Sequence, residues 1–204
     1  MGYESPMPVQ EEVIPFLLGD DNDVIALAQT GTGKTAAFGL PILQKIDVTT
    51  YHPQALVLCP TRELCLQIAD DLNDYSKYID NLKVLPVYGG SSIESQIKTL
   101  KRGVHVVVAT PGRLLDLMNR KTVDLSLVKN VIMDEADEML NMGFTDSINA
   151  ILAEVPENRN MLLFSATMPK EIANITKKYM KNPKEIVIGN KNEGNKNIRD
   201  IYYM

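Results

Sequence analysis

The chain has 204 residues, of which 45% are hydrophobic and 23% charged, as in an ordinary soluble globular protein. No apolar run approaches the roughly 18 residues of a membrane-spanning helix, and residues 1–30 lack the layout of a secretory leader. The net charge of −5 argues against a nucleic-acid partner unless basic residues gather on one edge of the molecule.

Seven short apolar runs recur along the chain. They cover residues 23–28, 55–59, 82–88, 104–109, 130–134, 160–164 and 184–188. The runs are apolar nearly throughout rather than alternating, which is typical of strands covered on both faces in a parallel sheet. Longer segments separate them, so strand and helix alternate. This order predicts one α/β domain with a doubly wound, mainly parallel sheet of about seven strands and helices on both faces.

Two of the intervening segments have clear helical spacing. The apolar stripes are Leu64, Ile68 and Leu72 in the first segment and Ile93, Ile97 and Leu100 in the second. Pro41 interrupts the helix expected after residue 33 and should kink or end it. Cys59 closes an apolar run and Cys65 falls in a helix, so we expect two reduced core thiols in a cytoplasmic protein. The histidines, His52 and His105, lack the spacing of metal ligands.

The last residues, 189–204, change in character. Their first half is rich in Asn, Gly and Lys, as in a linker, and the closing IRDIYYM resembles the start of another strand. We therefore expect an ATP-binding domain at 1–188, followed by a linker and the beginning of a second domain that the chain does not include.

Unusual peptides follow six of the seven runs. They are QTGTGKT (29–35), PTREL (60–64), GG (89–90), TPGR (110–113), EAD (135–137) and SAT (165–167). In a parallel sheet the segments after the strands lie along one edge, where ligands bind. The sequence therefore predicts that all six peptides share the carboxyl edge of the sheet.

The peptide AQTGTGKT (28–35) has the pattern of a phosphate-binding loop between a strand and a helix. Gly31 and Gly33 let backbone N–H groups approach phosphate oxygens, and the helix N-terminus adds partial positive charge. Lys34 is expected to reach the β and γ phosphates, and the Thr35 hydroxyl to ligate Mg²⁺. Ala28 stands where the usual pattern has Gly. The alternative is a Gly-rich turn that only begins a helix.

The peptide VIMDEADEML (131–140) places four carboxylates after a strand. Asp134 is the expected partner of a nucleotide-bound Mg²⁺, through water, because such an ion needs few protein ligands. Glu135 is the expected general base or positioner of the attacking water. We expect Asp137 to hold a neighbouring loop. A solvated helix start is the alternative, and it is the interpretation kept for Glu138.

Three threonines follow strands and could each cap a helix. They are Thr61, Thr110 and Thr167. Pro111 fits a first helical turn, and capping alone would explain all of these residues. A row of helix N-termini is also a row of phosphate sites, to which Arg62 and Arg113 would add charge for a nucleic-acid backbone. Both interpretations stay open on physical grounds.

Taken in order, these peptides resemble the DEAD-box RNA helicases of superfamily 2. GYESPMPVQ (2–10) is similar to the Q motif, AQTGTGKT (28–35) to motif I and PTREL (60–64) to motif Ia. TPGR (110–113) is similar to motif Ib, DEAD (134–137) to motif II and SAT (165–167) to motif III. The match covers nearly the whole chain, and DEADEMLNMGF (134–144) is similar to bacterial members. The resemblance implies a RecA-like P-loop NTPase lobe with Lys34, Asp134 and Glu135 as catalytic residues.

The resemblance also implies ATP and Mg²⁺ as cofactors and the backbone of single-stranded RNA as a partner. The implied ATP-binding residues are Tyr3, Gln10, Ala28, Gln29, Thr30, Gly31, Thr32, Gly33, Lys34 and Thr35. Among these, Gln10 would read the adenine edge. The implied RNA-binding residues are Pro60, Thr61, Arg62, Gly89, Gly90, Thr110, Pro111, Gly112 and Arg113. Asp137, Ser165 and Thr167 would couple nucleotide state to RNA binding.

The chain departs from the family pattern in three places. Met7 stands where Thr is usual, the aromatic residue upstream of the Q motif is absent, and so is the arginine-bearing motif of a C-terminal RecA-like lobe. Such an arginine is worth about 10³ to 10⁵ in rate in related enzymes. The chain alone is therefore expected to bind ATP weakly, hydrolyse it very slowly and not unwind duplexes.

Three other functions remain open from the sequence. The parent protein could be an ATP-gated RNA clamp that does not unwind, an unrelated P-loop enzyme such as a small-molecule kinase, or a DNA translocase. No lid or acceptor pocket of a kinase is evident in the sequence. The RNA 2′-hydroxyl would distinguish an RNA enzyme from a DNA translocase.

Overall fold

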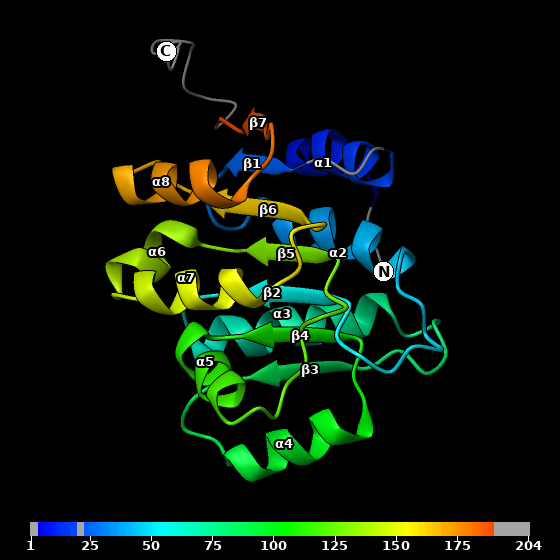
Figure 1. Ribbon diagram of the computed structural model, residues 1–204. Coiled ribbons are helices and arrows are strands. Elements are labelled where there is room, and N and C mark those ends of the chain that lie inside the picture. The colour runs from blue at the N-terminus through cyan, green and yellow to red at the C-terminus, as the bar shows by residue number, and fades with distance from the viewer. Residues whose placement is uncertain (1–3, 20–22, 190–204) are drawn as a thin grey trace.

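A computed structural model shows a seven-stranded sheet between two groups of helices (Figure 1). The structure describes residues 4–19 and 23–189. The strands are β1 (Val24–Leu27), β2 (Ala55–Leu58), β3 (Val84–Val87), β4 (Val106–Ala109), β5 (Asn130–Met133), β6 (Asn160–Ser165) and β7 (Lys184–Val187). Their order is β3-β4-β2-β5-β6-β1-β7, and every neighbouring pair is parallel. The predicted parallel α/β sheet is confirmed, with one strand for each apolar run.

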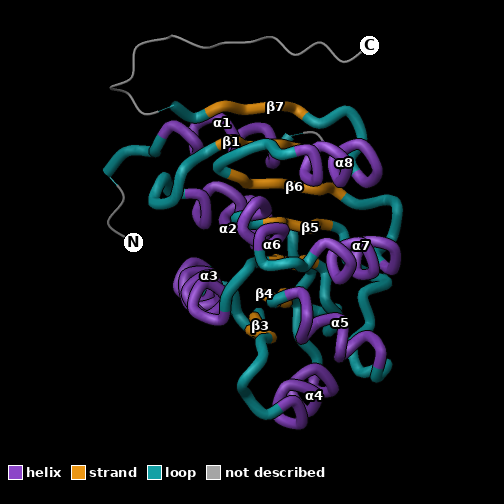
Figure 2. Tube along the Cα trace, turned by 90° about the vertical axis from the view of Figure 1, so that its left-hand side faces the viewer, coloured by secondary structure: helices purple, strands orange, loops and turns teal. Residues whose placement is uncertain are grey.

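Helices cover both faces of the sheet, as the turned view shows (Figure 2). The helices are α1 (Pro8–Leu18), α2 (Lys34–Gln44), α3 (Arg62–Tyr75), α4 (Ile93–Arg102), α5 (Pro111–Asn119), α6 (Ala136–Asn141), α7 (Thr145–Glu154) and α8 (Lys170–Tyr179). Helices α1, α2 and α3 pack on one face, where they share a core cluster with alternate strand residues. Helices α4, α5, α6, α7 and α8 contribute to the cluster on the other face, together with the apolar strand residues that point that way.

The two core clusters explain why the strands are apolar throughout. Within β5, Val131 and Met133 belong to one cluster, whereas Ile132 belongs to the other. Successive side chains of a strand point to opposite faces, so a strand covered on both sides needs apolar residues at every position. The Phe38 ring of α2 and the Phe164 ring of β6 meet with centroids 5.6 Å apart in the α1–α3 cluster.

Pro41 was expected to kink or end helix α2, and the structure shows that it does not end the helix. The helix continues through Pro41 to Gln44, and the two residues after the proline, Ile42 and Leu43, are buried. Burial of these side chains offsets the hydrogen bond that the proline cannot donate. Helix α1 also has a proline inside it, Pro15. The sequence pattern did not identify this segment as a helix.

The two cysteines are free and buried, as predicted. A hydrogen bond with Cys65 and burial both raise the pKa of the Cys59 thiol, so this thiol stays protonated. No helix in the described ranges is both long and apolar enough to cross a bilayer. The expected linker lies outside the described residues except for Gly189, so the division at residue 188 stays a prediction.

The buried carboxylate of Asp23 joins three segments at the amino edge of the sheet. It is 4% exposed, and its two oxygens accept hydrogen bonds from the backbone amides of Met161 and Lys181. These bonds connect the start of β1 with β6 and with the loop that leads into β7.

Asp23→Ala should leave both amides without an acceptor and lower the free energy of unfolding by about 2 to 4 kcal/mol. Urea denaturation monitored by circular dichroism measures the loss. Asp80→Ala, which removes an exposed aspartate, is the control and should change stability by less than about 0.5 kcal/mol. Equal midpoints for the two variants would contradict the role assigned to Asp23.

Candidate nucleotide and nucleic-acid site

The glycine-rich peptide lies between the carboxyl end of β1 and the first residue of α2. Gly33 has a φ of 79°, a conformation that a residue with a side chain rarely adopts. A Cβ at Gly33 would also lie 2.6 Å from Nε2 of Gln10, so the Gln10 side chain would have to move. The Thr32 hydroxyl donates to the Gln29 carbonyl over 2.8 Å and closes the turn. The predicted strand, turn and helix of a phosphate-binding loop are all present.

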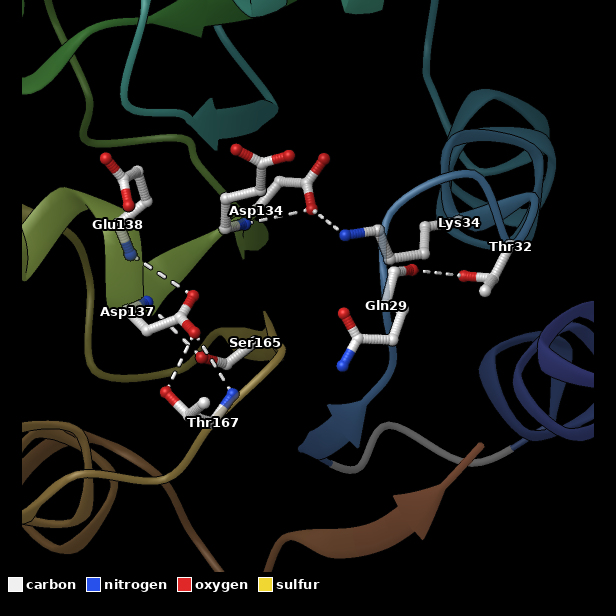
Figure 3. Close-up of polar contacts among 9 residues, drawn as sticks. Gln29, Thr32, Lys34, Asp134, Asp137, Glu138, Ser165 and Thr167 are labelled. Atoms are coloured by element: carbon white, nitrogen blue, oxygen red, sulfur yellow. Dashed lines mark hydrogen bonds and ion pairs between the residues drawn. The ribbon is translucent and has the colours of Figure 1, made fainter. Parts of the chain in front are cut away.

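Lys34 and Asp134 form an ion pair at the centre of the site (Figure 3). The Lys34 Nζ atom lies 3.0 Å from Oδ1 of Asp134, and the two side chains are 8% and 4% exposed. Strand β6 separates the strands that lead into these residues, so the contact spans the carboxyl edge over β6. The geometry brings together the two residues on which the magnesium-nucleotide hypothesis depends.

Glu135 adopts a strained backbone conformation beside this pair. Its φ and ψ are 50° and 52°, in the left-handed region, and its amide donates to Oδ1 of Asp134 over 3.0 Å. Burial raises the pKa of Glu135, and the charge of Asp134 raises it further, against the opposing effect of Lys34. A carboxyl group with a raised pKa in a site is a candidate for proton transfer.

Asp137 connects motif II with the peptide that follows β6. Its Oδ2 atom accepts hydrogen bonds from the Thr167 amide over 3.0 Å and from the Thr167 hydroxyl over 2.8 Å (Figure 3). The Asp137 amide donates to the Ser165 hydroxyl over 3.3 Å. Burial raises the pKa of Asp137, but the hydrogen bonds from Thr167 and Ser165 outweigh it and hold the pKa below its usual range. Glu138 is exposed, as expected.

Gln10 lies at the first turn of α1 and touches the phosphate-binding loop. The side chain is 5% exposed; its Oε1 accepts from the Met7 amide over 2.9 Å, and its Nε2 donates to the Gly33 carbonyl over 3.2 Å. The sequence suggested only an adenine contact for Gln10 and missed this link to the loop. Tyr3 lies outside the described residues.

Two arginines lie near the turn after β3, in the peptides that follow β2 and β4. The guanidinium of Arg62 lies 5.1 Å from the ring centroid of Tyr88. Nη1 of Arg113 donates to the Ser91 carbonyl over 3.0 Å and to Oε1 of Gln96 over 3.1 Å. Net charge alone disfavoured a nucleic-acid partner, but this half of the edge carries the local positive charge that such a partner requires.

The three threonines behave differently from one another. The Thr61 hydroxyl accepts from the Leu64 amide over 3.2 Å and caps α3, as the capping interpretation expects. Thr110 occupies the cap position of α5 without a side-chain hydrogen bond, and Pro111 opens that helix. The capping interpretation is wrong for Thr167, because α8 begins at Lys170 after Pro169 and the threonine bonds Asp137 instead.

Tyr88 and Gln96 were not identified from the sequence as site residues. Gln96 could have been recognised from the sequence, because it lies three residues after Ile93 on the apolar stripe that Ile93, Ile97 and Leu100 form. A polar residue at a position where the pattern requires an apolar one is an error unless it has a function. Tyr88 left no comparable signal, because aromatic residues are common at strand ends.

Comparisons with known proteins identify the family. The model of the DEAD/DEAH box helicase family matches residues 7–175. The chain belongs to this family. It is 52% identical over 202 residues to the ATP-dependent RNA helicase DeaD of Mycobacterium tuberculosis and 50% identical over 188 residues to that of Escherichia coli K12. These alignments cover 99% and 92% of this chain but only 36% and 30% of the relatives, so the chain spans about a third of their length.

Solved structures of DEAD-box proteins have the same fold. A DEAD box protein from Methanococcus jannaschii superposes with a TM-score of 0.87 at 46% identity, over 91% of this chain and 50% of that one. A hypothetical ATP-dependent RNA helicase from Sulfolobus tokodaii superposes with a TM-score of 0.84 at 44% identity, over 92% of this chain and 54% of that one. The RecA-like P-loop fold implied by the motifs is therefore confirmed.

The carboxylates suit a metal ion that arrives with a nucleotide. Among the described residues, no group of three or more His, Cys, Asp or Glu side chains could hold a metal by itself. Mg²⁺ on a nucleotide keeps several waters and takes one or two protein ligands in addition to phosphate oxygens. Asp134 and the half-buried Thr35 fit that requirement in number and in chemistry.

Glu135→Gln should stabilise the DEAD-box chain near neutral pH. The folded protein holds the pKa of Glu135 above its ordinary value of 4.5, so the ionised carboxylate destabilises the folded state. Solvent screening leaves less than about 1 kcal/mol, which corresponds to a rise in melting temperature of about 2 °C. The gain should disappear below pH 4.5, where the carboxyl group is protonated in both states.

Thermal melts of both proteins at neutral and acidic pH measure this difference. Glu138→Gln removes the same charge from an exposed position nearby and serves as the matched control. A gain that persists unchanged at acidic pH, or one that Glu138→Gln reproduces, would show that the burial of Glu135 is not its cause.

Proposed function

We propose that the chain is the N-terminal ATP-binding lobe of an ATP-dependent RNA helicase that works in the cytoplasm. The observation that carries the proposal is the 3.0 Å contact between Lys34 and Asp134, which joins the phosphate-binding loop to the DEAD peptide. The similar proteins of Mycobacterium tuberculosis and Escherichia coli are both named ATP-dependent RNA helicase DeaD. Two buried free thiols are consistent with a reducing compartment.

The loop would hold the phosphates of ATP at the N-terminus of α2. Backbone N–H groups from Gly31 to Thr35 and the partial charge of the helix would attract the anion. Lys34 would exchange its contact with Asp134 for the β and γ phosphates, and Asp134 and Thr35 would then hold Mg²⁺, largely through water. A bound Mg²⁺ neutralises charge that develops on the γ-phosphate during transfer.

Glu135 would orient the attacking water and accept its proton. Its amide bonds Oδ1 of Asp134, which keeps the residue beside the Lys34–Asp134 pair, and its raised pKa favours accepting a proton over remaining ionised. The chain would supply these groups on one side of the γ-phosphate only. A C-terminal lobe would supply the arginine on the other side, so the isolated chain should be a very slow ATPase.

The other half of the edge would grip one RNA strand by its backbone. The residues proposed for this contact are Pro60, Thr61, Arg62, Gly89, Gly90, Thr110, Pro111, Gly112 and Arg113. Contacts of this kind with phosphates and riboses carry no base-sequence information. The hydrogen bonds from Thr167 to Asp137 lie beside the proposed ATP site and would transmit nucleotide state to the RNA-binding half and to the second lobe.

Lys34→Ala should abolish most ATP binding by the chain. The variant loses a charged donor to the phosphates, worth about 1.5–3 kcal/mol or about ten- to a hundredfold in affinity. Titration with a fluorescent ATP analogue and Mg²⁺ measures the change, and Lys178→Ala on the exposed face of α8 is the control. Undiminished binding by Lys34→Ala would contradict a nucleotide site at this loop.

Addition of the C-terminal lobe should raise ATP turnover by about 10³ to 10⁵, and only when RNA is present. The measurement compares phosphate release by the 204-residue chain and by the full-length parent, each with RNA, with DNA of the same sequence and without nucleic acid. Robust RNA-stimulated turnover by the chain alone would refute the dependence on a second lobe. Slow RNA release without strand displacement by the parent would identify a clamp rather than a helicase.

A further inference from the structure

Gln96 is a buried polar residue on a helix whose apolar residues are only partly buried. It is 5% exposed, whereas Ile93 and Ile97 on the same face of α4 are half-buried. Burial of an amide is costly unless both of its ends are hydrogen-bonded. Both ends are satisfied here: Nε2 donates to the Tyr88 carbonyl over 3.2 Å, and Oε1 accepts from Nη1 of Arg113 over 3.1 Å.

These bonds fix the direction of the Arg113 side chain. Nη1 donates to Gln96 and to the Ser91 carbonyl, which lies 3.0 Å away. The guanidinium is a rigid planar fork, so two bonds on one nitrogen orient the whole group. In the part of the chain that the structure describes, Nε and Nη2 have no hydrogen-bond partner. That free edge has the geometry that binds a phosphate through two parallel hydrogen bonds.

The same amide also fixes the turn after β3. The carbonyl that Gln96 holds belongs to Tyr88, whose ring lies against the guanidinium of Arg62. Gly90 follows in the same turn with a φ of 80°, and a Cβ placed on it would lie 3.6 Å from Nη1 of Arg62. One buried side chain therefore ties together Arg62 at the start of α3, Gly90 in the turn after β3 and Arg113 in α5.

We propose that Gln96 is a positioning residue for single-stranded RNA. It holds Arg113 and the turn at 88–91 in their phosphate-binding arrangement before RNA arrives. Ordering these groups in advance removes part of the entropy cost of binding. The inference rests on the proposed function, because it presumes that this half of the edge binds an RNA backbone.

Gln96→Met keeps the size and flexibility of the side chain but removes both hydrogen bonds. It should weaken binding of a fluorescein-labelled oligouridine by about tenfold, since the charge-assisted contact of Arg113 with one phosphate is lost. The affinity for a fluorescent ATP analogue should not change, because Gln96 makes no contact with the phosphate-binding loop. Fluorescence anisotropy of the 204-residue chain at low salt measures the RNA affinity.

A double-mutant cycle separates positioning from general destabilisation. On an Arg113→Ala background, Gln96→Met should weaken RNA binding less than it does on the unmutated background, because the part of its effect that passes through the arginine is already lost. The slope of log affinity against log salt should also be shallower for Gln96→Met by about 0.7, the loss of one phosphate contact on a single strand. If Gln96 were purely structural, Gln96→Met would lower RNA affinity by the same factor on both backgrounds and leave the salt slope unchanged.

Gln54→Met provides the matched control. Gln54 is also 5% exposed, and its amide bonds the backbone of Asp47 and Thr50 in the loop before β2, away from the arginines. Gln54→Met should lower the melting temperature, as Gln96→Met does, but should leave RNA affinity unchanged. If the unmutated chain binds no RNA, the proposed function fails; if it binds and Gln96→Met binds equally well, only the inference on Gln96 fails.

Discussion

The contact between Lys34 and Asp134 constrains the whole arrangement of the site. Two buried charges are tolerated only as a close pair, so the ends of β1 and β5 must lie on one edge at a separation that the two side chains can bridge. Only β6 lies between these strands, which leaves the SAT peptide between the phosphate-binding loop and the DEAD peptide. The hydrogen bonds from Thr167 to Asp137 are a direct consequence of this strand order.

The strand order also divides the carboxyl edge by charge. The ends of β1, β6 and β5 carry the carboxylates and Lys34, whereas the ends of β2, β4 and β3 carry Arg62 and Arg113. A net charge of −5 is therefore compatible with a phosphate-rich partner, because two arginines lie where β2, β4 and β3 end. The boundary between the halves lies at β5 and β2, where the Asp134 amide donates to the Leu58 carbonyl.

Two residues of the site are maintained at a cost to local structure. Glu135 has a left-handed backbone and a carboxyl group whose pKa is raised by burial. Gln96 places an amide at a buried position of α4, where an aliphatic side chain would need no hydrogen-bond partners. Strain and buried polar groups of this kind persist only where the surrounding structure compensates them, and both residues lie on the edge to which the motifs belong.

The sequence alone determined the strands, their parallel arrangement and the shared edge of the motifs. Continuous apolar runs and a glycine-rich turn are local patterns, and parallel strands place their carboxyl ends together whatever their order. Tertiary structure decided what depends on contacts between distant residues: the continuation of α2 past Pro41, the bonding of Thr167 to Asp137 instead of a helix end, and the partners of Gln10 and Gln96. No local pattern encodes these contacts, because each is set by which strands are neighbours and by how the helices pack between them.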